Sequence, residues 1–294
     1  MSEHVERIAE SVPGVPAGKS RAKRVRPEAA ARRPAAGPGW RAQLADWGQA
    51  AALPAAVLAV WQIAGGAGWV SAEFLPTPAS IAASFFRLAA SGELLRHLEI
   101  SVWRALLGFA AGSALGLLLG LLTGLFRSAA YLLDPALQVL RLIPHLAVAP
   151  LIILWFGFGE VSKVAIIMSG SFFPIYIHTF AGIRGVENKL YEVGRVLAFG
   201  PWQRLRRLVL PAALPNILLG LRLSMAVAWI GLVVAELIGS RSGVGFLINE
   251  AKQNSDTAVI FVGILIFAVV GKLIDTLFRF LEKRLLFWRD SYRG

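Results

Sequence analysis

The stretch that decides the fold is the polar, basic interruption RGVENKLYEVGRVLAFGPWQRLRRLVLPAALP, residues 184–215, which lies between two hydrophobic segments. It contains six basic residues, a Gly-Pro break and two closing prolines. Leu190, Val193 and Leu197 repeat at i, i+3 and i+7, which predicts a short amphipathic helix with one apolar stripe. Such a patterned insert favours a docking surface for another protein. An interfacial helix without a partner is the alternative interpretation.

Composition indicates that the rest of the chain lies in a bilayer. Hydrophobic residues make up 56% of the 294 residues and charged residues 16%. The apolar segments approach the ~20 residues that cross ~30 Å of hydrocarbon as a helix. Barrel strands would be about 10 residues long and would alternate in polarity. We therefore predict an all-α polytopic protein with about six transmembrane helices, at residues 50–70, 102–126, 137–156, 164–183, 217–238 and 259–280.

The distribution of basic residues predicts the topology. Residues 1–46 are rich in Ala, Pro, Gly and Arg and have no apolar period, so we expect a disordered basic tail. If the tail is cytoplasmic, most basic residues fall on the cytoplasmic side, as the positive-inside rule requires. Both termini and the insert are then cytoplasmic, and the net charge of +12 is not evidence for nucleic-acid binding. The outer segments keep only Arg87, Arg96, Lys163, Arg241 and Lys252.

Glycines recur at a fixed interval in the second predicted span. Four residues advance a helix by slightly more than one turn, so these glycines form a slowly winding groove along one side. Another helix can approach closely at such a groove. The groove therefore predicts helix packing and says nothing of a substrate. Its members are Gly108, Gly112, Gly116, Gly120 and Gly124.

Charged and aromatic residues inside spans are candidates for a transport pathway. Lys272 and Asp275 lie one turn apart and are expected to pair with each other. Glu236 lies near the outer end of the fifth predicted span and is expected to reach the interface. A buried, hydrogen-bonded side chain is the default interpretation of His145, and packing or interfacial anchoring is the default for the aromatic residues. The pathway candidates are His145, Phe173, Tyr176 and Glu236.

No enzyme motif is present in the sequence. The four histidines have no metal-site spacing, and the chain has no cysteine. A Gly-Lys-Ser triplet at residues 18–20 lacks the preceding glycine and strand of a phosphate-binding loop. We therefore expect no cofactor or metal in this chain, and any energy from ATP must come from a partner.

The insert resembles the EAA loop of ABC import permeases, the coupling helix that docks on the ATPase. Glu192-Val193-Gly194 and Leu210-Pro211 carry the resemblance, although Val193 and Gly194 replace two alanines and Ala198 replaces the usual glycine. The ATPase-coupling residues implied by the resemblance are Glu192, Val193, Gly194, Leu197, Ala198, Phe199, Gly200, Leu210 and Pro211.

Segments elsewhere resemble the aliphatic sulfonate permeases, in a branch that includes taurine and nitrate importers. They include SVWRALLG at 101–108, LIILWFG at 151–157 and GVGFL at 243–247, and the resemblance runs from about residue 53 to residue 288. It implies a type I importer in the bacterial inner membrane, with a second copy of this chain, two ATP-binding subunits that hold ATP and Mg²⁺, a periplasmic substrate-binding protein and surrounding membrane lipid.

The predicted organisation follows from the spans and the resemblance. It comprises the cytoplasmic tail (1–46), a first transmembrane helix with a periplasmic segment (47–96), an ABC type-1 permease domain (97–282) and a cytoplasmic C-terminal tail (283–294). Taurine and nitrate remain alternative substrates. A proton-coupled secondary transporter that uses Glu236, Lys272 and Asp275 is an alternative of another class. A membrane enzyme is disfavoured by the lack of any nucleophile or metal constellation.

Overall fold

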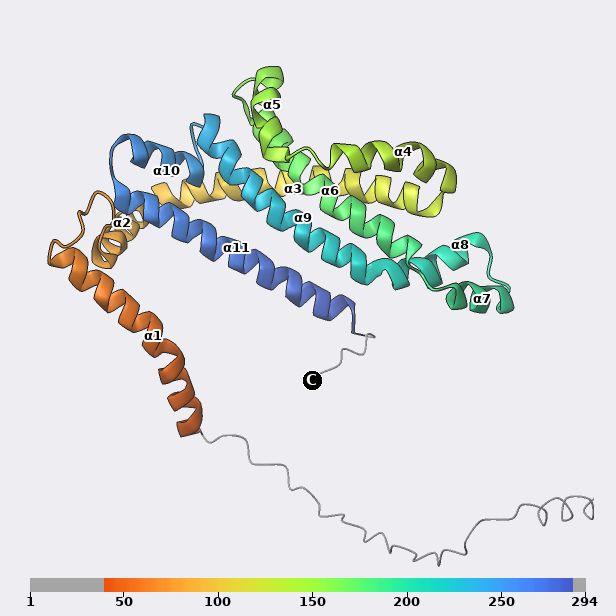
Figure 1. Cartoon of the computed structure of the whole chain (residues 1–294), viewed down its shortest axis with the longest axis horizontal. Helices are drawn as coiled ribbons and strands as arrows, with labels where there is room; N and C mark the ends of the chain where they lie inside the picture. The colour runs from red at the N-terminus through yellow and green to blue at the C-terminus, as the bar shows by residue number, and fades with distance from the viewer. Residues whose placement is uncertain (1–39, 288–294) are drawn as a thin grey trace, which may run out of the picture. The chain divides into compact units, whose positions relative to one another are not determined.

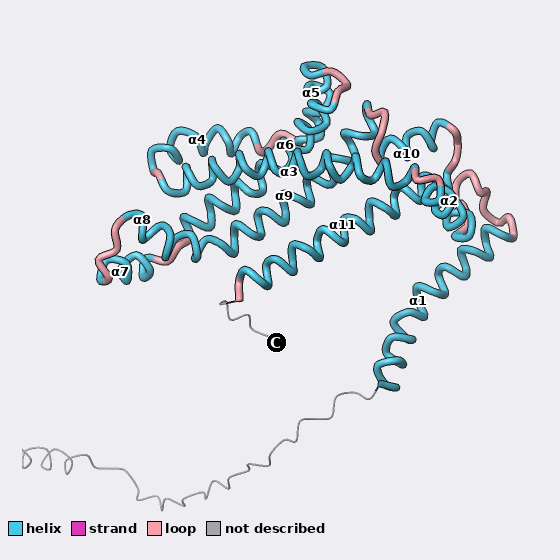
Figure 2. Tube along the Cα trace, turned by 180° about the vertical axis from the view of Figure 1, so that it is seen from behind, coloured by secondary structure: helices cyan, strands magenta, loops and turns pink. Residues whose placement is uncertain are grey.

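The computed structural model describes residues 40–287, with side chains from Ala52 onward, and every regular element in that range is a helix (Figures 1 and 2). The chain divides into two units after Pro54, and the packing of interest lies within the second. The elements are α1 (Trp40–Gly66), α2 (Pro78–Ala90), α3 (Glu93–Leu125), α4 (Arg127–Leu140), a 3-10 turn (His145–Val148), α5 (Ala149–Phe156), α6 (Glu160–Arg184), α7 (Asn188–Val196), α8 (Pro201–Arg204), a π-helical turn (Leu205–Val209), α9 (Leu210–Gly239), α10 (Val244–Gln253) and α11 (Thr257–Leu285).

Four of these helical segments are long and apolar enough to cross a membrane, namely α3, α6, the continuous segment from α8 to α9, and α11. The bent pair formed by α4 and the 145–156 segment would make a fifth. Helix α1 overlaps the predicted first span, and within it the stretch Ala52–Gly66 is apolar. The all-α polytopic fold class is confirmed. The predicted tail, by contrast, lies mostly outside the described residues, since α1 begins at Trp40.

The third predicted span, residues 137–156, is not one helix, and that prediction is wrong. α4 ends at Leu140, and the segment that resumes at His145 is turned by 80°. A proline disfavours the helical conformation of the residue before it, and Pro144 itself is extended, with φ −59° and ψ 115°. A second proline, Pro150, lies in the first turn of α5, where its missing N–H costs nothing.

Helix α6 is the centre of the bundle, because it packs against α3 on one side and against α9 on the other (Figure 1). The glycine groove of α3 faces α6. A Cβ atom on Gly116 would lie 2.5 Å from Ile175 Cγ2 and 2.5 Å from the carbonyl oxygen of Phe172. The α6 residues over the groove repeat at the same interval of four, so two matched rows bring the backbones together. They are Ile167, Ser171, Ile175, Thr179 and Ile183.

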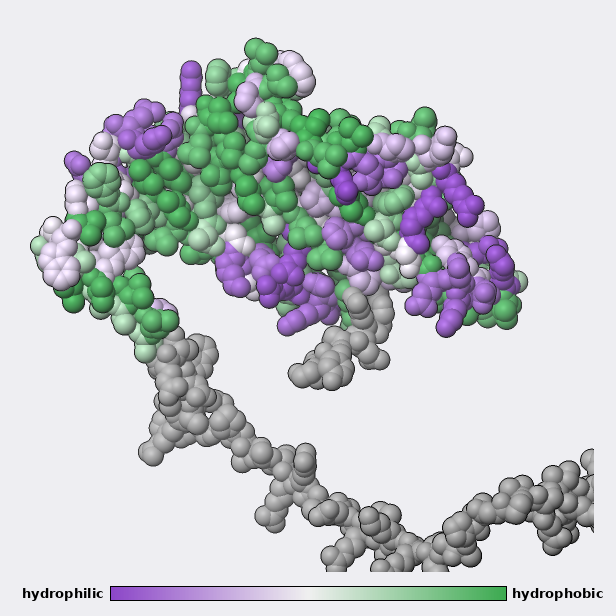
Figure 3. Space-filling model, in the orientation of Figure 1, coloured by the Kyte–Doolittle hydropathy of each residue, from purple (hydrophilic) through white to green (hydrophobic). Residues whose placement is uncertain are grey.

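The bundle has two chemically distinct ends. α7 and α8 lie at one end, and α10 and α2 lie at the other (Figure 1). Hydrophobic side chains cover the middle of the face shown in Figure 3, whereas hydrophilic ones gather around α7 and α8. Large apolar side chains such as Trp103 and Leu118 are more than half exposed. An apolar belt between polar ends is the surface that a bilayer requires.

Candidate functional site

Helix α7 presents an exposed apolar face at its end of the bundle. Val196 is 86% exposed, Leu197 56% and Val193 47%. Together with Lys189 and Glu192 they line a shallow groove of about 410 Å³. We call these five residues the α7 face. An apolar centre with one charge of each sign at its edge is typical of a surface that another protein covers.

The opposite side of α7 is fixed against the start of the next helices. Gly194 is buried there, and a Cβ atom on it would lie 2.8 Å from Leu208 Cδ1. Tyr191 packs against the cluster that contains Val209 and Ala213. The small residue at position 194 lets α7 lie close to the π-helical turn that leads into α9.

The turn after α7 is tightly hydrogen-bonded. The N–H of Phe199 donates to the carbonyl of Gly194 at 2.9 Å, and Arg204 Nε donates to the carbonyl of Phe199 at 2.8 Å. The Arg207 guanidinium lies 5.6 Å from the centroid of the Phe199 ring. Ala198 has φ +50°, a left-handed conformation that favours glycine. This conformation explains why glycine is the usual residue at position 198 of the motif.

Three more predicted coupling residues lie at the two helix starts that follow. Gly200 is the N-cap residue of α8, and its N–H donates to Gln203 Oε1 at 3.1 Å. Leu210 and Pro211 begin α9, directly after the π-helical turn, and both are half-buried. They are therefore part of the base of α9, whereas Val193 and Leu197 belong to the α7 face.

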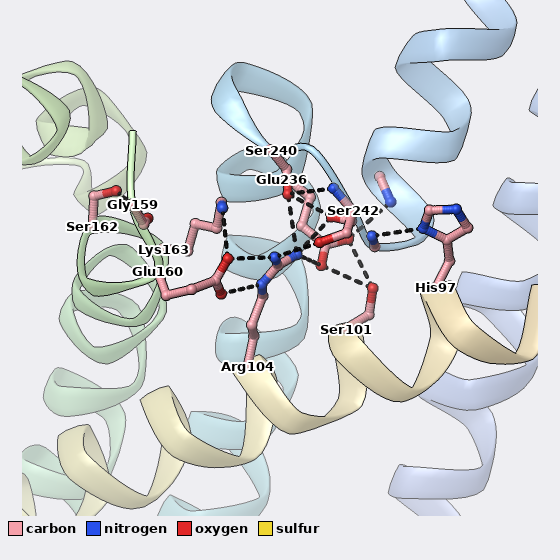
Figure 4. Close-up of polar contacts among 12 residues, drawn as sticks. His97, Ser101, Arg104, Gly159, Glu160, Ser162, Lys163, Glu236, Ser240 and Ser242 are labelled. Atoms are coloured by element: carbon pink, nitrogen blue, oxygen red, sulfur yellow. Dashed lines mark hydrogen bonds and ion pairs between the residues drawn. The ribbon is translucent and has the colours of Figure 1, made fainter. Parts of the chain in front are cut away.

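A buried polar cluster occupies the other end of the bundle (Figure 4). At its centre is Arg104 of α3, which is 2% exposed. Its guanidinium donates to Glu236 of α9 at 2.8 Å and to both carboxylate oxygens of Glu160 of α6 at 2.6 Å. Lys163 contacts the same Glu160 at 2.9 Å. Removal of one partner from a buried ion pair typically costs about 3–5 kcal/mol, so Arg104 and Glu236 tie α3 to α9.

The same cluster holds the segment between α9 and α10. Arg104 Nη1 donates to the carbonyl of Ser242 at 2.6 Å, and Ser101 Oγ accepts from the N–H of Val244 at 2.8 Å. His97 Nδ1 accepts from the N–H of Gly243 at 2.9 Å. The hydrogen bond to Nδ1 assigns the proton of a neutral His97 to Nε2. Three side chains of α3 therefore fix three consecutive residues, the last two of the loop and the first of α10.

The family model for "binding-protein-dependent transport system inner membrane component" matches residues 112–287, which is more than half of the chain. The chain belongs to this family. It is 56% identical to a Bacillus subtilis (strain 168) protein named as an aliphatic sulfonates transport permease, over 84% of this chain and 90% of the relative. An Escherichia coli (strain K12) protein with the same description is 44% identical, over 86% of this chain and 95% of the relative.

A solved amino acid ABC transporter has the same fold, with a TM-score of 0.58 and 18% identity, over 67% of this chain and 96% of that one. The family assignment made from the sequence is therefore confirmed. The permease is a multi-pass inner membrane component of a transport system, and its relatives are permeases rather than enzymes. Within residues 40–287, no group of three or more His, Asp or Glu side chains is placed to hold a metal ion.

Sequence reasoning found only one member of the polar cluster in this permease, Glu236, and placed it wrongly. Glu236 does not reach the interface, because it is fully buried and bound by Arg104 and Ser101. The available signal was Arg104 itself, a charge inside the second predicted span. A charged residue at that depth needs a partner, and the carboxylates among the other spans are few.

The four pathway candidates do not meet at one site. Glu236 belongs to the polar cluster, around Glu160 at the start of α6. Tyr176 lies 16 residues further along α6, which is about 24 Å along the helix axis, and its hydroxyl donates to Asp134 of α4 at 2.7 Å.

The other two pathway candidates have no shared partner. His145, at the bend after α4, packs against Gly170, and its Nε2 has no hydrogen-bond partner among the described residues. The default interpretation of His145 as a hydrogen-bonded histidine therefore does not hold for that atom. Phe173 is half-buried and packs edge-on against Phe172, with ring centroids 4.8 Å apart.

Asp275 does not pair with Lys272, so the predicted pairing is wrong. Asp275 instead forms ion pairs with Arg222 of α9, at 2.7 Å, and with Arg279, at 2.9 Å. Two guanidinium nitrogens of Arg222 reach the same carboxylate oxygen, a geometry that a lysine ammonium does not offer. The ion pair joins α9 to α11 and does not form a relay within α11.

Proposed function

We propose that this chain is the membrane subunit of an ATP-driven, binding-protein-dependent importer of aliphatic sulfonates. The substrate class is supported by the 56% identity to a relative named for sulfonate transport, over most of both chains. The energy source is supported by the α7 face, which is exposed at the end of the bundle and fixed at its back to the base of α9. The α7 face is the single observation that carries the coupling part of the proposal.

In the proposed assembly, the α7 face docks in a groove on an ATP-binding subunit. Each importer contains two copies of this permease and two ATP-binding subunits, and ATP and Mg²⁺ are held by those subunits. A periplasmic binding protein delivers the substrate to the opposite end, around residues 241–256. This arrangement puts both termini and α7 in the cytoplasm and agrees with the excess of basic residues on that side.

The proposed mechanism follows from the charge of the substrate. A sulfonate is an anion at physiological pH, and moving an ion into a low-dielectric medium costs tens of kcal/mol. The pathway must therefore be lined by protein and open to one side at a time. Closure of the ATP-binding subunits moves α7, and α7 moves α9 through Gly194 and the π-helical turn. The permease dimer then opens outward, and ATP hydrolysis resets it.

The carboxylates available to a proton-coupled transporter have cationic partners. Glu236 is paired with Arg104, and Asp275 is paired with Arg222 and Arg279. A proton relay needs a carboxylate that can take up and release a proton, and protonation of either carboxylate would weaken an ion pair that joins two helices of the bundle. The secondary-transporter alternative is therefore not supported by the geometry.

The test is uptake of radiolabelled ethanesulfonate by proteoliposomes that contain the permease, its ATP-binding subunit and its binding protein. We expect uptake with internal or external ATP, according to orientation, to exceed uptake without ATP by more than about tenfold, because outward opening needs the ATP-bound state. Excess taurine and excess nitrate are expected to compete weakly. Full competition by either one would reassign the substrate, and uptake driven by a proton gradient without ATP would contradict the proposed function.

A further inference from the structure

The polar cluster and the loop before α10 form one connected unit at the end of the bundle opposite α7. His97, Ser101 and Arg104 recur at i, i+4 and i+7, so they lie on one face of α3. That face points at the loop between α9 and α10, as Figure 4 shows. Each of the three side chains contacts backbone of this loop, within the hydrogen-bond distances of 2.6 to 2.9 Å.

Glu236 completes the connection to α10. Its carboxylate accepts the N–H of Gly245 at 2.9 Å, while Ser101 accepts the N–H of Val244 and His97 that of Gly243. The first N–H groups of a helix have no partner within the helix. At the start of α10, side chains of α3 and α9 supply acceptors for three of these N–H groups. The backbone of Gly243 has φ +107°, and a Cβ atom there would collide with the Glu236 carboxylate.

The far end of α10 is the part that faces outward. Glu250, Lys252 and Asn254 are exposed, and a hollow of about 310 Å³ lies between this end of α10, α2 and the start of α11. Arg87 and Asp256, which line the hollow, are paired at 3.3 Å. This polar surface is carried by the helix whose N-terminus the polar cluster holds.

Arg104 is not available to bind a substrate anion itself. All three of its nitrogens donate to oxygen atoms of Glu160, Glu236, Ser240 and Ser242. Two carboxylates already surround the guanidinium, so a third anion would be repelled. The cluster is therefore suited to holding a position rather than to recognising a ligand.

We propose that Arg104 and Glu236 are positioning residues that hold α10 in the orientation in which its exposed end contacts the substrate-binding protein. The inference rests on the proposed function, because it needs a binding protein that docks at this end. The inference goes beyond the proposed function because it assigns a role to one buried residue pair. This pair lies away from the docking surface and sets the affinity of the permease for the binding protein.

The test is a double variant, Arg104→Met with Glu236→Met, which removes both charges of the buried pair and leaves Glu160 its contact with Lys163. An apolar pair of similar size is generally tolerated in place of a buried ion pair. The complete transporter is reconstituted, and ATP hydrolysis is titrated with substrate-loaded binding protein. We expect the concentration of binding protein that gives half-maximal stimulation to rise by about tenfold or more, with the maximal rate within about twofold of the unaltered transporter.

A matched control replaces a second arginine–carboxylate pair that involves α9, as Arg222→Met with Asp275→Met. That pair joins α9 to α11 and has no contact with the polar cluster. For this control, the concentration of binding protein that gives half-maximal stimulation is expected to stay within about twofold of the value for the unaltered transporter. An equal rise in the control would show a general loss of packing and would overturn the assignment.

Three other outcomes separate this inference from the proposed function. An unaltered transporter that no binding protein stimulates would refute the proposed function itself. A stimulated unaltered transporter, with an unchanged half-maximal concentration in the Arg104→Met, Glu236→Met variant, would refute only the positioning role. If that variant does not assemble, Arg104→Lys replaces it, since lysine keeps the charge and loses the planar fork. An Arg104→Lys half-maximal concentration equal to that of the unaltered transporter would refute the positioning role as well.

Discussion

An aspartate in place of Val196 is expected to lower the affinity of the permease for its ATP-binding subunit by about a hundredfold. Val196 is 86% exposed, so the substitution leaves the packing of α7 intact. In the proposed complex, however, the carboxylate would be buried in an apolar contact without a partner. A cost of about 3 kcal/mol corresponds to two factors of ten in affinity. The measurement is the dissociation constant between the purified permease in nanodiscs and the ATP-binding subunit.

Val196→Thr is the matched control, because threonine keeps the branched shape and adds no charge. Its dissociation constant is expected to rise by less than about tenfold, since the swap of one methyl group for an uncharged hydroxyl costs about 1 kcal/mol at an interface. Unchanged binding by Val196→Asp would mean that the α7 face is not covered by the ATP-binding subunit. A fall in binding by both variants alike would point to a shape constraint rather than to burial of charge.

A leucine in place of Gly116 is expected to break the contact between α3 and α6. Even a Cβ atom at that position would lie 2.5 Å from the carbonyl oxygen of Phe172, which cannot move without moving α6. Overpacking of this kind costs about 3 kcal/mol or more. The expected fall in the midpoint of thermal unfolding is about 10 °C, measured in detergent by the loss of the monodisperse peak.

Gly66→Ala is the matched control for the glycine substitution. No atom lies within 4 Å of a Cβ built on Gly66, so its unfolding midpoint is expected to change little. An unchanged midpoint for Gly116→Leu would show that α3 and α6 do not approach each other along the glycine groove.

Regular patterns in the sequence predicted the parts of the fold that depend on residues close together along the chain. The five glycines at intervals of four residues predicted a close helix contact, and the apolar pattern of the insert predicted the short helix α7. The helix at residues 164–183 was predicted, but its role as the partner of the glycine groove was not, because its matching row includes Ser171 and Thr179, which hide the apolar period. Long apolar segments predicted the membrane-crossing helices. One predicted segment, residues 137–156, is divided by the bend at Pro144.

Pairings between distant segments could not be read from the sequence. Arg104 and Glu236 are 132 residues apart, and only the packing of α3 against α9 brings them together. Local spacing misled the assignment of Asp275, because a lysine one turn away competes with an arginine 53 residues away that has the better geometry. Glu192, Val193 and Leu197 of the α7 face were identified by resemblance, whereas Lys189 and Val196 were not. The exposure of all five became known only from the structure.

The most direct measurement of the central claim uses the lack of cysteine in this chain. Val196→Cys places a single thiol on the α7 face, and Trp69→Cys places one at an exposed position, 77% accessible, before α2. If α7 is the cytoplasmic contact of an ATP-binding subunit, Val196→Cys will cross-link to that subunit and resist a membrane-impermeant maleimide added to intact cells, whereas Trp69→Cys will be labelled. Labelling of Val196→Cys from outside the cell, or no cross-link in the assembled transporter, would contradict the account.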